Sequence, residues 1–265
     1  MTTGNPMENR MKNLMDANKA PVGIFSVLGG ATTAEALCLT GIDYIIFDTE
    51  HGPYDVEHTA MLLRTAELHG VTGVVRVKDS TRSSILKMLD IGASAIIIPQ
   101  VQNLEEVKNI VEYGKYYPVG RRGMSFGRRT GFGELDFASG NIQNYFDTCN
   151  RQTLLIPQCE TVGCLEQIED IMALDGVDGI FVGPYDLSMT MGIAKQFEHP
   201  DFLAALERIK NAARSNHKFA IIYCADAQLG HQRLQEGFDS VAVGNDVNFF
   251  IDAVKDMVAD TRGAE

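Results

Sequence analysis

The stretch GIDYIIFDTEHGPYD at residues 41–55 joins a buried-type strand to a polar, charged end. Its run YIIFD at 44–48 carries apolar side chains on both faces, as do AIIIP at 95–99, TLLIPQ at 153–158 and GIFVG at 179–183. Strands of this kind are typical of parallel sheets that helices cover on both sides. Acidic and imidazole side chains follow the run at once, in Asp48, Glu50 and His51. The stretch therefore predicts a parallel α/β fold with chemistry at the carboxyl ends of its strands.

Similar runs recur along the whole chain, with helical stretches between them. We predict strands at Val22–Val27, Tyr44–Asp48, Val74–Val77, Ala95–Pro99, Thr153–Cys159, Gly179–Gly183, Phe219–Tyr223 and Ser240–Val243. Eight strands that alternate with helices in about 250 residues describe a (β/α)₈ TIM barrel. A doubly wound open sheet is the alternative, but the chain has neither GxGxxG after the first strand nor GxxxxGK[ST].

The connecting segments show helical periodicity. In TAMLLRTAELHG at 59–70, the pattern places Met61, Leu62, Thr65 and Leu68 on one face and makes Gly70 the end of a helix. SSILKMLDIG at 83–92 and NLEEVKNIVEYG at 103–114 are predicted to be helices that each stop at their glycine. Residues 100–152 are too many for one helix and a turn, and they contain GRRGMSFGRRTGFG at 120–133. We expect one barrel domain over residues 1–265, with a functional Gly/Arg-rich loop region around 100–152.

Composition excludes several classes of protein. The charge sum is 23 − 35 = −12, which disfavours nucleic acid as a partner. No run of eighteen apolar residues is present, and the first twenty residues lack the apolar core of a signal peptide, so we expect no membrane span and a cytoplasmic protein. Five cysteines without a CxxC pair indicate a reduced protein that has no structural zinc.

The predicted strand ends bring a distinctive set of side chains to one rim. Glu160 and Asp186 follow neighbouring strands, and two carboxylates with water and a chelating substrate suit Mg²⁺ or Mn²⁺. Arg76 could hold a substrate carboxylate, and His51 could act as a general base. Each residue alone also has a structural explanation, such as a solvated strand end or a helix cap. Their joint occurrence on successive strands favours the functional one.

Two further motifs have weaker support. Cys159 lies between Gln158 and Glu160, so its side chain should point into the core rather than form a nucleophile pair with His51. Ser125 in GMSFG matches the nucleophile-elbow pattern GxSxG, but it lies in the Gly/Arg-rich loop and not at a strand end.

Longer segments resemble one known family. FDTEHGPYD at 47–55, VVRV at 74–77, LKMLDIGASAIIIPQVQN at 86–103, GRRG at 120–123, PQCE at 157–160 and GVDGIFVGPYDLSMTMG at 176–192 are similar to the metal-dependent (class II) pyruvate aldolases of the HpcH/HpaI aldolase family. The likeness is to the 4-hydroxy-2-oxoheptanedioate aldolase type and covers nearly the whole chain in order. It implies a barrel whose last helix is exchanged between subunits, and a hexamer with active sites near subunit contacts.

The resemblance also implies roles for individual residues. Glu160 and Asp186 resemble the metal ligands, for Mg²⁺, Mn²⁺ or Co²⁺, and Arg76 resembles the arginine that holds the pyruvyl oxygens and the enolate. His51 resembles the catalytic histidine, which acts with a metal-bound water and is supported by Asp90.

The remaining implied roles concern substrate binding. Gln158 resembles the glutamine beside the metal, and the turn Gly183-Pro184-Tyr185 resembles the one whose backbone amides at positions 183 and 185 grip the pyruvate carboxylate. Asp48 and Glu50 match acidic positions behind these groups. Among the loop arginines, which could instead pair with acids of a neighbouring subunit, Arg122 is our choice for attracting an anionic aldehyde, because it lies in the matching GRRG piece.

The predicted reaction is reversible aldol cleavage of a 4-hydroxy-2-oxo acid into pyruvate and an aldehyde, through a metal-bound pyruvate enolate. Oxaloacetate decarboxylation, or a macrophomate-synthase-like reaction, would use the same enolate. A Schiff-base aldolase through Lys78 is a second enzymatic alternative, although it leaves Glu160 and Asp186 without a role. The non-enzymatic alternative is a barrel that binds 2-oxo acids without turnover.

Overall fold

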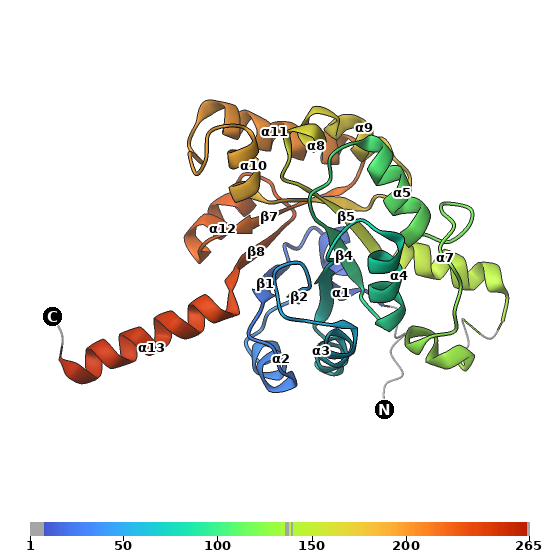
Figure 1. Cartoon of the computed structure of the whole chain (residues 1–265), viewed down its shortest axis with the longest axis horizontal. Helices are drawn as coiled ribbons and strands as arrows, with labels where there is room; N and C mark the ends of the chain where they lie inside the picture. Colours follow the sequence, from blue (N-terminus) through green and yellow to red (C-terminus); the bar gives the residue numbers. More distant parts are fainter. Residues whose placement is uncertain (1–7, 136–137, 139, 264–265) are drawn as a thin grey trace.

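Eight parallel strands close into a barrel in the order β1 to β8 in a computed structural model, which describes residues 8–135, 138 and 140–263 (Figure 1). This confirms the predicted (β/α)₈ fold, and every strand boundary lies within two residues of its prediction. The strands are β1 (Val22–Ser26), β2 (Tyr44–Asp48), β3 (Thr72–Arg76), β4 (Ala95–Ile98), β5 (Leu154–Cys159), β6 (Gly179–Val182), β7 (Phe219–Cys224) and β8 (Ser240–Asn245).

Helices are arranged around the barrel in Figure 1. They are α1 (Arg10–Asp16), α2 (Ala31–Cys38), α3 (Val56–Leu68), α4 (Arg82–Ile91), α5 (Leu104–Gly114), the 3₁₀ helix η1 (Arg128–Gly133), α7 (Ile142–Gln152), α8 (Val162–Glu166), α9 (Ile168–Ala173), α10 (Pro184–Thr190), α11 (Pro200–Ser215), α12 (Ala227–Gln235) and α13 (Asp246–Arg262).

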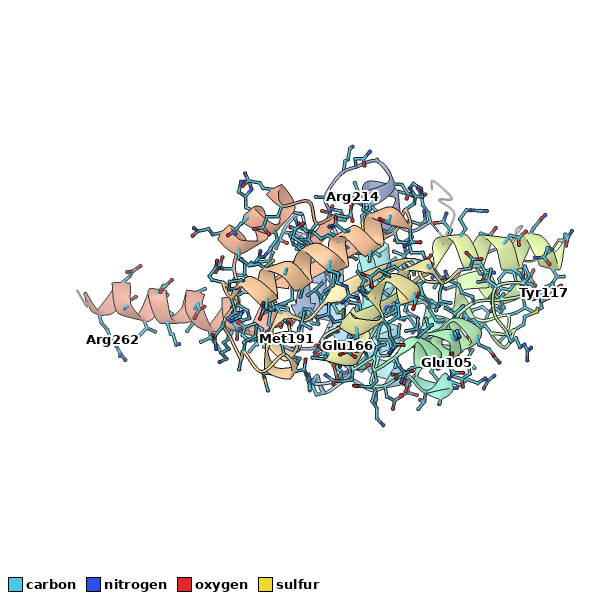
Figure 2. The ribbon with its side chains drawn as sticks, turned by 90° about the horizontal axis from the view of Figure 1, so that it is seen from above. Glu105, Tyr117, Glu166, Met191, Arg214 and Arg262 are labelled. Carbon is cyan, nitrogen blue, oxygen red and sulfur yellow. The ribbon has the colours of Figure 1, made fainter. Side chains whose placement is uncertain are left out.

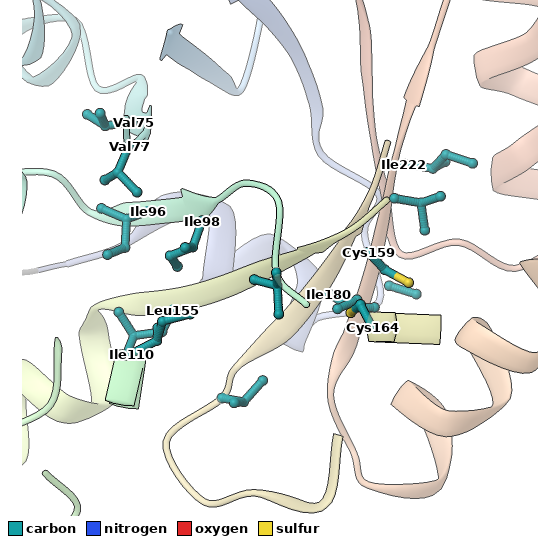
Figure 3. Packing of buried hydrophobic residues seen from close by; sticks show 14 of the residues in the cluster. Val75, Val77, Ile96, Ile98, Ile110, Leu155, Cys159, Cys164, Ile180 and Ile222 are labelled. Carbon is teal, nitrogen blue, oxygen red and sulfur yellow. The ribbon is translucent and has the colours of Figure 1, made fainter. Parts of the chain in front are cut away.

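Alternate residues of each strand enter two separate cores. Tyr44 and Ile46 of β2 belong to the cluster inside the barrel, whereas Ile45 and Phe47 belong to the layer between strands and helices. Figure 3 shows part of the outer layer, where Ile110 of α5 lies against Leu155 of β5. Because both faces of each strand are buried, the strands have to be apolar throughout, which is why they were recognisable in the sequence.

Helix α1 covers the amino-terminal end of the barrel. Met11 and Met15 are buried in the inner cluster, and the N–H of Met11 donates to Thr72 Oγ1 at 3.0 Å. The floor of the barrel is therefore closed by side chains. A substrate can therefore reach polar side chains at the opposite end of the barrel, where the carboxyl ends of the strands lie.

Three local predictions can be compared with the structure. Helix α5 ends at Gly114, as predicted, and an added Cβ at this glycine would meet Leu155 Cδ1 at 2.6 Å, so close packing also favours glycine there. The buried face of α3 includes Leu62 but not Met61 or Leu68, which is 84% exposed, because Leu68 lies six residues on and faces away. In its described residues, the region 100–152 contains α5, which includes the helix predicted at 103–114, and also η1 and α7.

Helix α13 differs from the other long helices because it extends away from the barrel. Figure 1 shows it projecting from β8, and Figure 2 shows the same from above, with Arg262 near its far end. Asp246 is its one buried residue. Within the described residues, none of the helices combines the length and the apolar character needed to cross a bilayer.

Candidate active site

Asp48 and Arg76 occupy paired positions at the ends of β2 and β3. Arg76 donates to the Asp48 carboxylate twice, from Nε to Oδ1 at 2.9 Å and from Nη2 to Oδ2 at 2.7 Å. Burial opposes the charge on Arg76, but the hydrogen bonds and charge of Asp48 outweigh it and raise the Arg76 pKa. The guanidinium also lies 4.9 Å from the centre of the Phe25 ring. Arg76 is therefore held in one position and remains charged.

The turn after β2 carries His51 and is shaped by the same aspartate. Asp48 Oδ1 accepts hydrogen bonds from the N–H of Glu50 at 3.1 Å and of His51 at 3.4 Å. Gly52 completes the turn, where an added Cβ would lie 2.1 Å from the Asp48 carbonyl oxygen. The His51 side chain is 72% exposed, and its Nε2 lies 3.8 Å from Glu50 Oε2. The imidazole thus sits at the rim, where it can exchange protons with substrate or water.

Glu160 lies beyond the end of β5 and is almost fully buried. Its Oε1 accepts from the backbone N–H of Gln100 at 2.7 Å and from Gln100 Nε2 at 3.0 Å, and its Oε2 accepts from Gln158 Nε2. Gln100 adopts a left-handed backbone conformation, with φ of 55°, to make this approach. Gln100 was not among the predicted site residues, although its place after β4 is a strand end like the others.

Negative charge accumulates around these groups. Burial raises the pKa of Glu160 to about 7. The negative charges of Asp186 and Glu50 also raise this pKa, whereas the hydrogen bonds from Gln100 and Gln158 lower it. Burial likewise raises the pKa of Glu50, with Arg76 opposing the shift. Four carboxylates, from Asp48, Glu50, Glu160 and Asp186, thus interact around one guanidinium. A bound cation would relieve this imbalance.

The local packing fits such a cation. Gln158 Oε1 is buried without a hydrogen-bond partner, so one polar oxygen is available beside Glu160. An added Cβ on Gly183 would lie 2.6 Å from Glu160 Oε2, so glycine alone keeps this space open. In the described part of the chain no three His, Cys, Asp or Glu side chains are arranged to hold a metal ion. That Glu160 and Asp186 supply two ligands, with water and substrate as the others, stays a prediction.

A pocket of about 400 Å³ opens above these residues. It brings together seven predicted residues, namely His51, Arg76, Gln158, Gly183, Pro184, Tyr185 and Asp186, while Glu160 lies behind Gln158 and Gly183. It also contains five residues that the sequence analysis missed: Phe25, Phe181, Tyr223, Asn245 and Asn248. The missed residues are aromatic or neutral, and nothing in the sequence distinguishes them from ordinary strand and helix residues.

Two predicted residues lie elsewhere. Arg122 Nη2 donates to Asp90 Oδ1 at 2.8 Å, and this pair lines a different pocket. Asp90 lies in the last turn of α4, and because that helix runs antiparallel to the strands, its end is remote from the strand ends that carry His51. Asp90 therefore does not line the pocket that contains His51, and its support of His51 stays a prediction. The Arg122 side chain is 7% exposed and paired with Asp90, and its role as a ligand of the aldehyde also stays a prediction.

The turn at Gly183 needs a smaller correction. The N–H of Gly183 donates to the Cys159 carbonyl at 3.3 Å, so it is not available to a substrate carboxylate. Pro184 has no N–H, which leaves the amides of Tyr185 and Asp186 in the first turn of α10.

The remaining reactive candidates lie outside the pocket. Lys78 is exposed and does not contribute to its lining. Cys159 is fully buried in the outer core, as predicted, and Figure 3 shows it beside Cys164.

Comparison with known proteins agrees with this geometry. Residues 22–253 match the model of the HpcH/HpaI aldolase/citrate lyase family. A hydroxypyruvate/pyruvate aldolase of Roseobacter denitrificans is 32% identical over 256 residues, which cover 95% of this chain and 96% of the relative. A 4-hydroxy-2-oxo-heptane-1,7-dioate aldolase of Escherichia coli is 31% identical over 255 residues, which cover 96% of this chain and 95% of the relative. The crystal structure of an HpcH/HpaI aldolase from Desulfitobacterium hafniense is similar to this structure, with a TM-score of 0.87 and 29% sequence identity. The aligned part covers 96% of this chain and 97% of the aldolase chain.

Proposed function

Because the chain belongs to the HpcH/HpaI aldolase/citrate lyase family, we propose that it is a carbon–carbon lyase that reversibly cleaves 4-hydroxy-2-oxo acids into pyruvate and an aldehyde. The observation that carries the proposal is one pocket in which a fixed guanidinium, an exposed imidazole and an unbalanced group of carboxylates converge. Glu160 and Asp186 would hold a divalent cation, Mg²⁺ or Mn²⁺. When bound, this cation would polarise the 2-oxo group.

Arg76 supplies fixed positive charge for the oxygen that becomes negative. One side of its guanidinium is engaged by Asp48, and the group lines the pocket beside Gln158. When the bond between C3 and C4 breaks, its electron pair moves into the pyruvate fragment and gives an enolate. A donor that is already oriented stabilises this charge without having to reorganise during the reaction.

His51 accepts the proton of the 4-hydroxyl group. Loss of that proton lets the C4 oxygen form the aldehyde carbonyl as the C3–C4 bond breaks, and protonation at C3 then releases pyruvate. In the synthetic direction the same imidazole returns its proton to the new alkoxide. Its 72% exposed side chain at the rim allows it to reach a group on the outer part of the substrate.

The first turn of α10 is suited to hold the carboxylate of the 2-oxo acid. The N–H groups of Tyr185 and Asp186 have no partner inside the helix, and the amino-terminal end of a helix favours negative charge. Asp186 would thus contribute to binding in two ways, through its backbone amide and through its carboxylate.

The test is release of pyruvate from 4-hydroxy-2-oxo-heptane-1,7-dioate, measured with and without a chelator. We expect excess chelator to abolish activity and added Mg²⁺ or Mn²⁺ to restore it. Asp186→Asn should lose activity, whereas Asp201→Asn should retain it, since Asp201 occupies the corresponding first turn of α11 and is exposed. Full activity of the native protein in excess chelator would contradict the proposed cation, and no pyruvate release under any condition would contradict the lyase.

A further inference from the structure

The candidate active-site pocket has two sides of different chemistry. Arg76 and Gln158 lie near the ends of β3 and β5, on the side that the proposed function assigns to the cation and the 2-oxo acid. Phe25, Tyr223 and Asn245 lie near the ends of β1, β7 and β8, which are consecutive in the closed barrel and form the opposite side. The part of a substrate that extends across the pocket from the 2-oxo acid therefore meets this second side.

Two side-chain amides belong to the second side. Asn245 immediately precedes α13, and Asn248 lies in the first turn of that helix. An asparagine at the position of Asn245 usually accepts a hydrogen bond from an N–H group of the first helical turn, as Asn9 does for α1 and Asn103 for α5. The side chain of Asn245 makes no such bond. Its amide is therefore not used by the helix and faces the pocket instead.

Aromatic rings complete the second side. The centre of the Tyr223 ring lies 5.8 Å from that of Phe25 and 6.1 Å from that of Tyr185, and both contacts are edge-to-face. The Phe25 ring is also 6.0 Å from the ring of Phe181, again edge-to-face. Because each ring is held by its neighbours, together they present a fixed apolar surface to the C–H groups of a short carbon chain.

The amides favour one kind of substituent on that chain. A side-chain amide has both donors and an acceptor, and a hydroxyl group also donates and accepts, so adjacent hydroxyl groups can pair with both amide atoms. A plain alkyl chain would leave the amides without these bonds. A carboxylate only accepts, and the five pocket residues of this side carry no charge to offset its loss of water: Phe25, Phe181, Tyr223, Asn245 and Asn248.

We propose that the pocket prefers uncharged aldehydes that carry adjacent hydroxyl groups, as glyceraldehyde does, with Asn245 and Asn248 binding the hydroxyl groups and Tyr223 covering the carbon chain. This inference rests on the proposed function, since it concerns the fragment that the cleavage releases as the aldehyde. The heptanedioate substrate releases an aldehyde with a carboxylate, so its cleavage should be slower than that of the 2-oxo acid formed from pyruvate and glyceraldehyde.

Addition of pyruvate to three aldehydes, with Mg²⁺ or Mn²⁺ supplied, tests this preference. Glyceraldehyde has two hydroxyl groups, propanal has the same chain without them, and succinic semialdehyde has a carboxylate. We expect kcat/KM of the native protein to be about 10–100 times higher for glyceraldehyde than for either of the others. An equal or higher value for propanal or succinic semialdehyde would overturn this inference and leave the lyase intact. No addition to any aldehyde, with no pyruvate release from the heptanedioate, would contradict the proposed function and this inference with it.

Variants separate recognition by the amides from the intrinsic reactivity of each aldehyde, which is the same for every variant. Asn245→Leu replaces the amide by an apolar side chain of similar size and should lower the ratio of kcat/KM for glyceraldehyde to that for propanal about tenfold. Asn211→Leu should keep the native ratio, since Asn211 is exposed in α11 and lies outside the pocket. If Asn245→Leu does not fold, Asn248→Ala, at an exposed position, should lower the ratio in the same way. A native ratio in the folded amide variant would overturn the inference.

Discussion

Asp48 makes four hydrogen bonds at the end of β2, and together they connect the two groups that the proposed reaction uses. Two hold Arg76, and two fix the turn that carries His51. The carboxylate itself is only 3% exposed and does not line the pocket. Its contribution to activity is therefore one of positioning, since it acts through Arg76 and His51 rather than by touching substrate.

Asp48→Asn should separate this positioning role from a general effect on folding. An asparagine keeps one acceptor oxygen but removes the charge that pairs with Arg76, so we expect kcat/KM to fall by about 10–100-fold. Exchange of the pyruvate methyl protons should slow as well, because it requires the same enolate. Asp55→Asn is the matched control: Asp55 caps α3 and lies outside the pocket. Unchanged exchange in Asp48→Asn would contradict the positioning role.

His51 and Arg76 should differ in which step they affect. His51→Ala should slow aldol cleavage by about 10²–10⁴-fold, and it should slow methyl proton exchange of pyruvate in deuterated water less. Arg76→Ala should reduce both, because Arg76 is assigned to the enolate oxygen. Decarboxylation of oxaloacetate, which needs no hydroxyl deprotonation, should follow the exchange rate. Identical losses in exchange and cleavage for the two variants would show that the roles are wrongly assigned.

The raised pKa of Glu160 predicts a pH-dependent affinity for the cation. With a pKa of about 7, the carboxyl group is protonated below that pH, and the proton competes with the metal. Mn²⁺ affinity, measured by calorimetry, should therefore fall about tenfold per pH unit below pH 7 and level off above it. Glu160→Gln should bind weakly and lack this dependence. An affinity of the native protein that is constant between pH 5 and pH 8 would refute it.

Sequence reasoning finds pocket residues in polar strand ends and motifs more readily than those inside apolar strands or in α13. Arg76, Gln158 and Asp186 lie at strand ends in an alternating chain, and strand ends converge in a parallel barrel. Phe25 and Tyr223 follow the same rule, but an aromatic residue in an apolar strand resembles any other core residue. Asp90 does not line the pocket, and similarity to a motif gives no information about which end of a helix faces a site.

At the scale of elements, the joint between β1, β8 and α13 depends on one buried carboxylate. Asp246 accepts from Ser26 Oγ at 2.7 Å and from the N–H of Val27 at 2.9 Å. It is also the first residue of α13, where it accepts from the N–H of Val247 at 2.8 Å. A single side chain thus closes the barrel between its first and last strands and orients the helix that follows.

Asp246→Ala should therefore destabilise the fold more than other changes in α13. It leaves the N–H groups of Val27 and Leu28 without this acceptor, and we expect a loss of about 2–3 kcal/mol in the free energy of unfolding. Chemical denaturation measures this loss. Asp252→Ala is the control, because Asp252 lies in the same helix and is exposed. Equal stability of the two variants would show that the joint does not depend on Asp246.

At the scale of the whole molecule, the barrel order follows from the sequence because every strand is buried on both faces and is followed by a helix. The path of α13 follows from the family resemblance, which implies an exchanged last helix, but not from the pattern of its own residues. Its apolar residues predict a helix that packs on something, and in a barrel the nearest surface is normally the barrel itself. In this chain Phe249, Phe250, Ile251, Val254 and Met257 are instead 38–60% exposed.

An exposed apolar helix of this length has a high free-energy cost in water, and an identical molecule is the partner that is always present. We therefore predict that α13 packs on a second copy of the chain, as the exchanged helix of a hexamer would.

Phe250→Ser combined with Met257→Ser should reduce the molecular mass measured by light scattering to that of smaller species. Activity should fall with it, since Asn245 and Asn248 beside the base of α13 line the pocket. Lys255→Ser combined with Asp256→Ser, exposed neighbours in the same helix, should leave the mass unchanged. A native protein that is monomeric at micromolar concentration would contradict this arrangement.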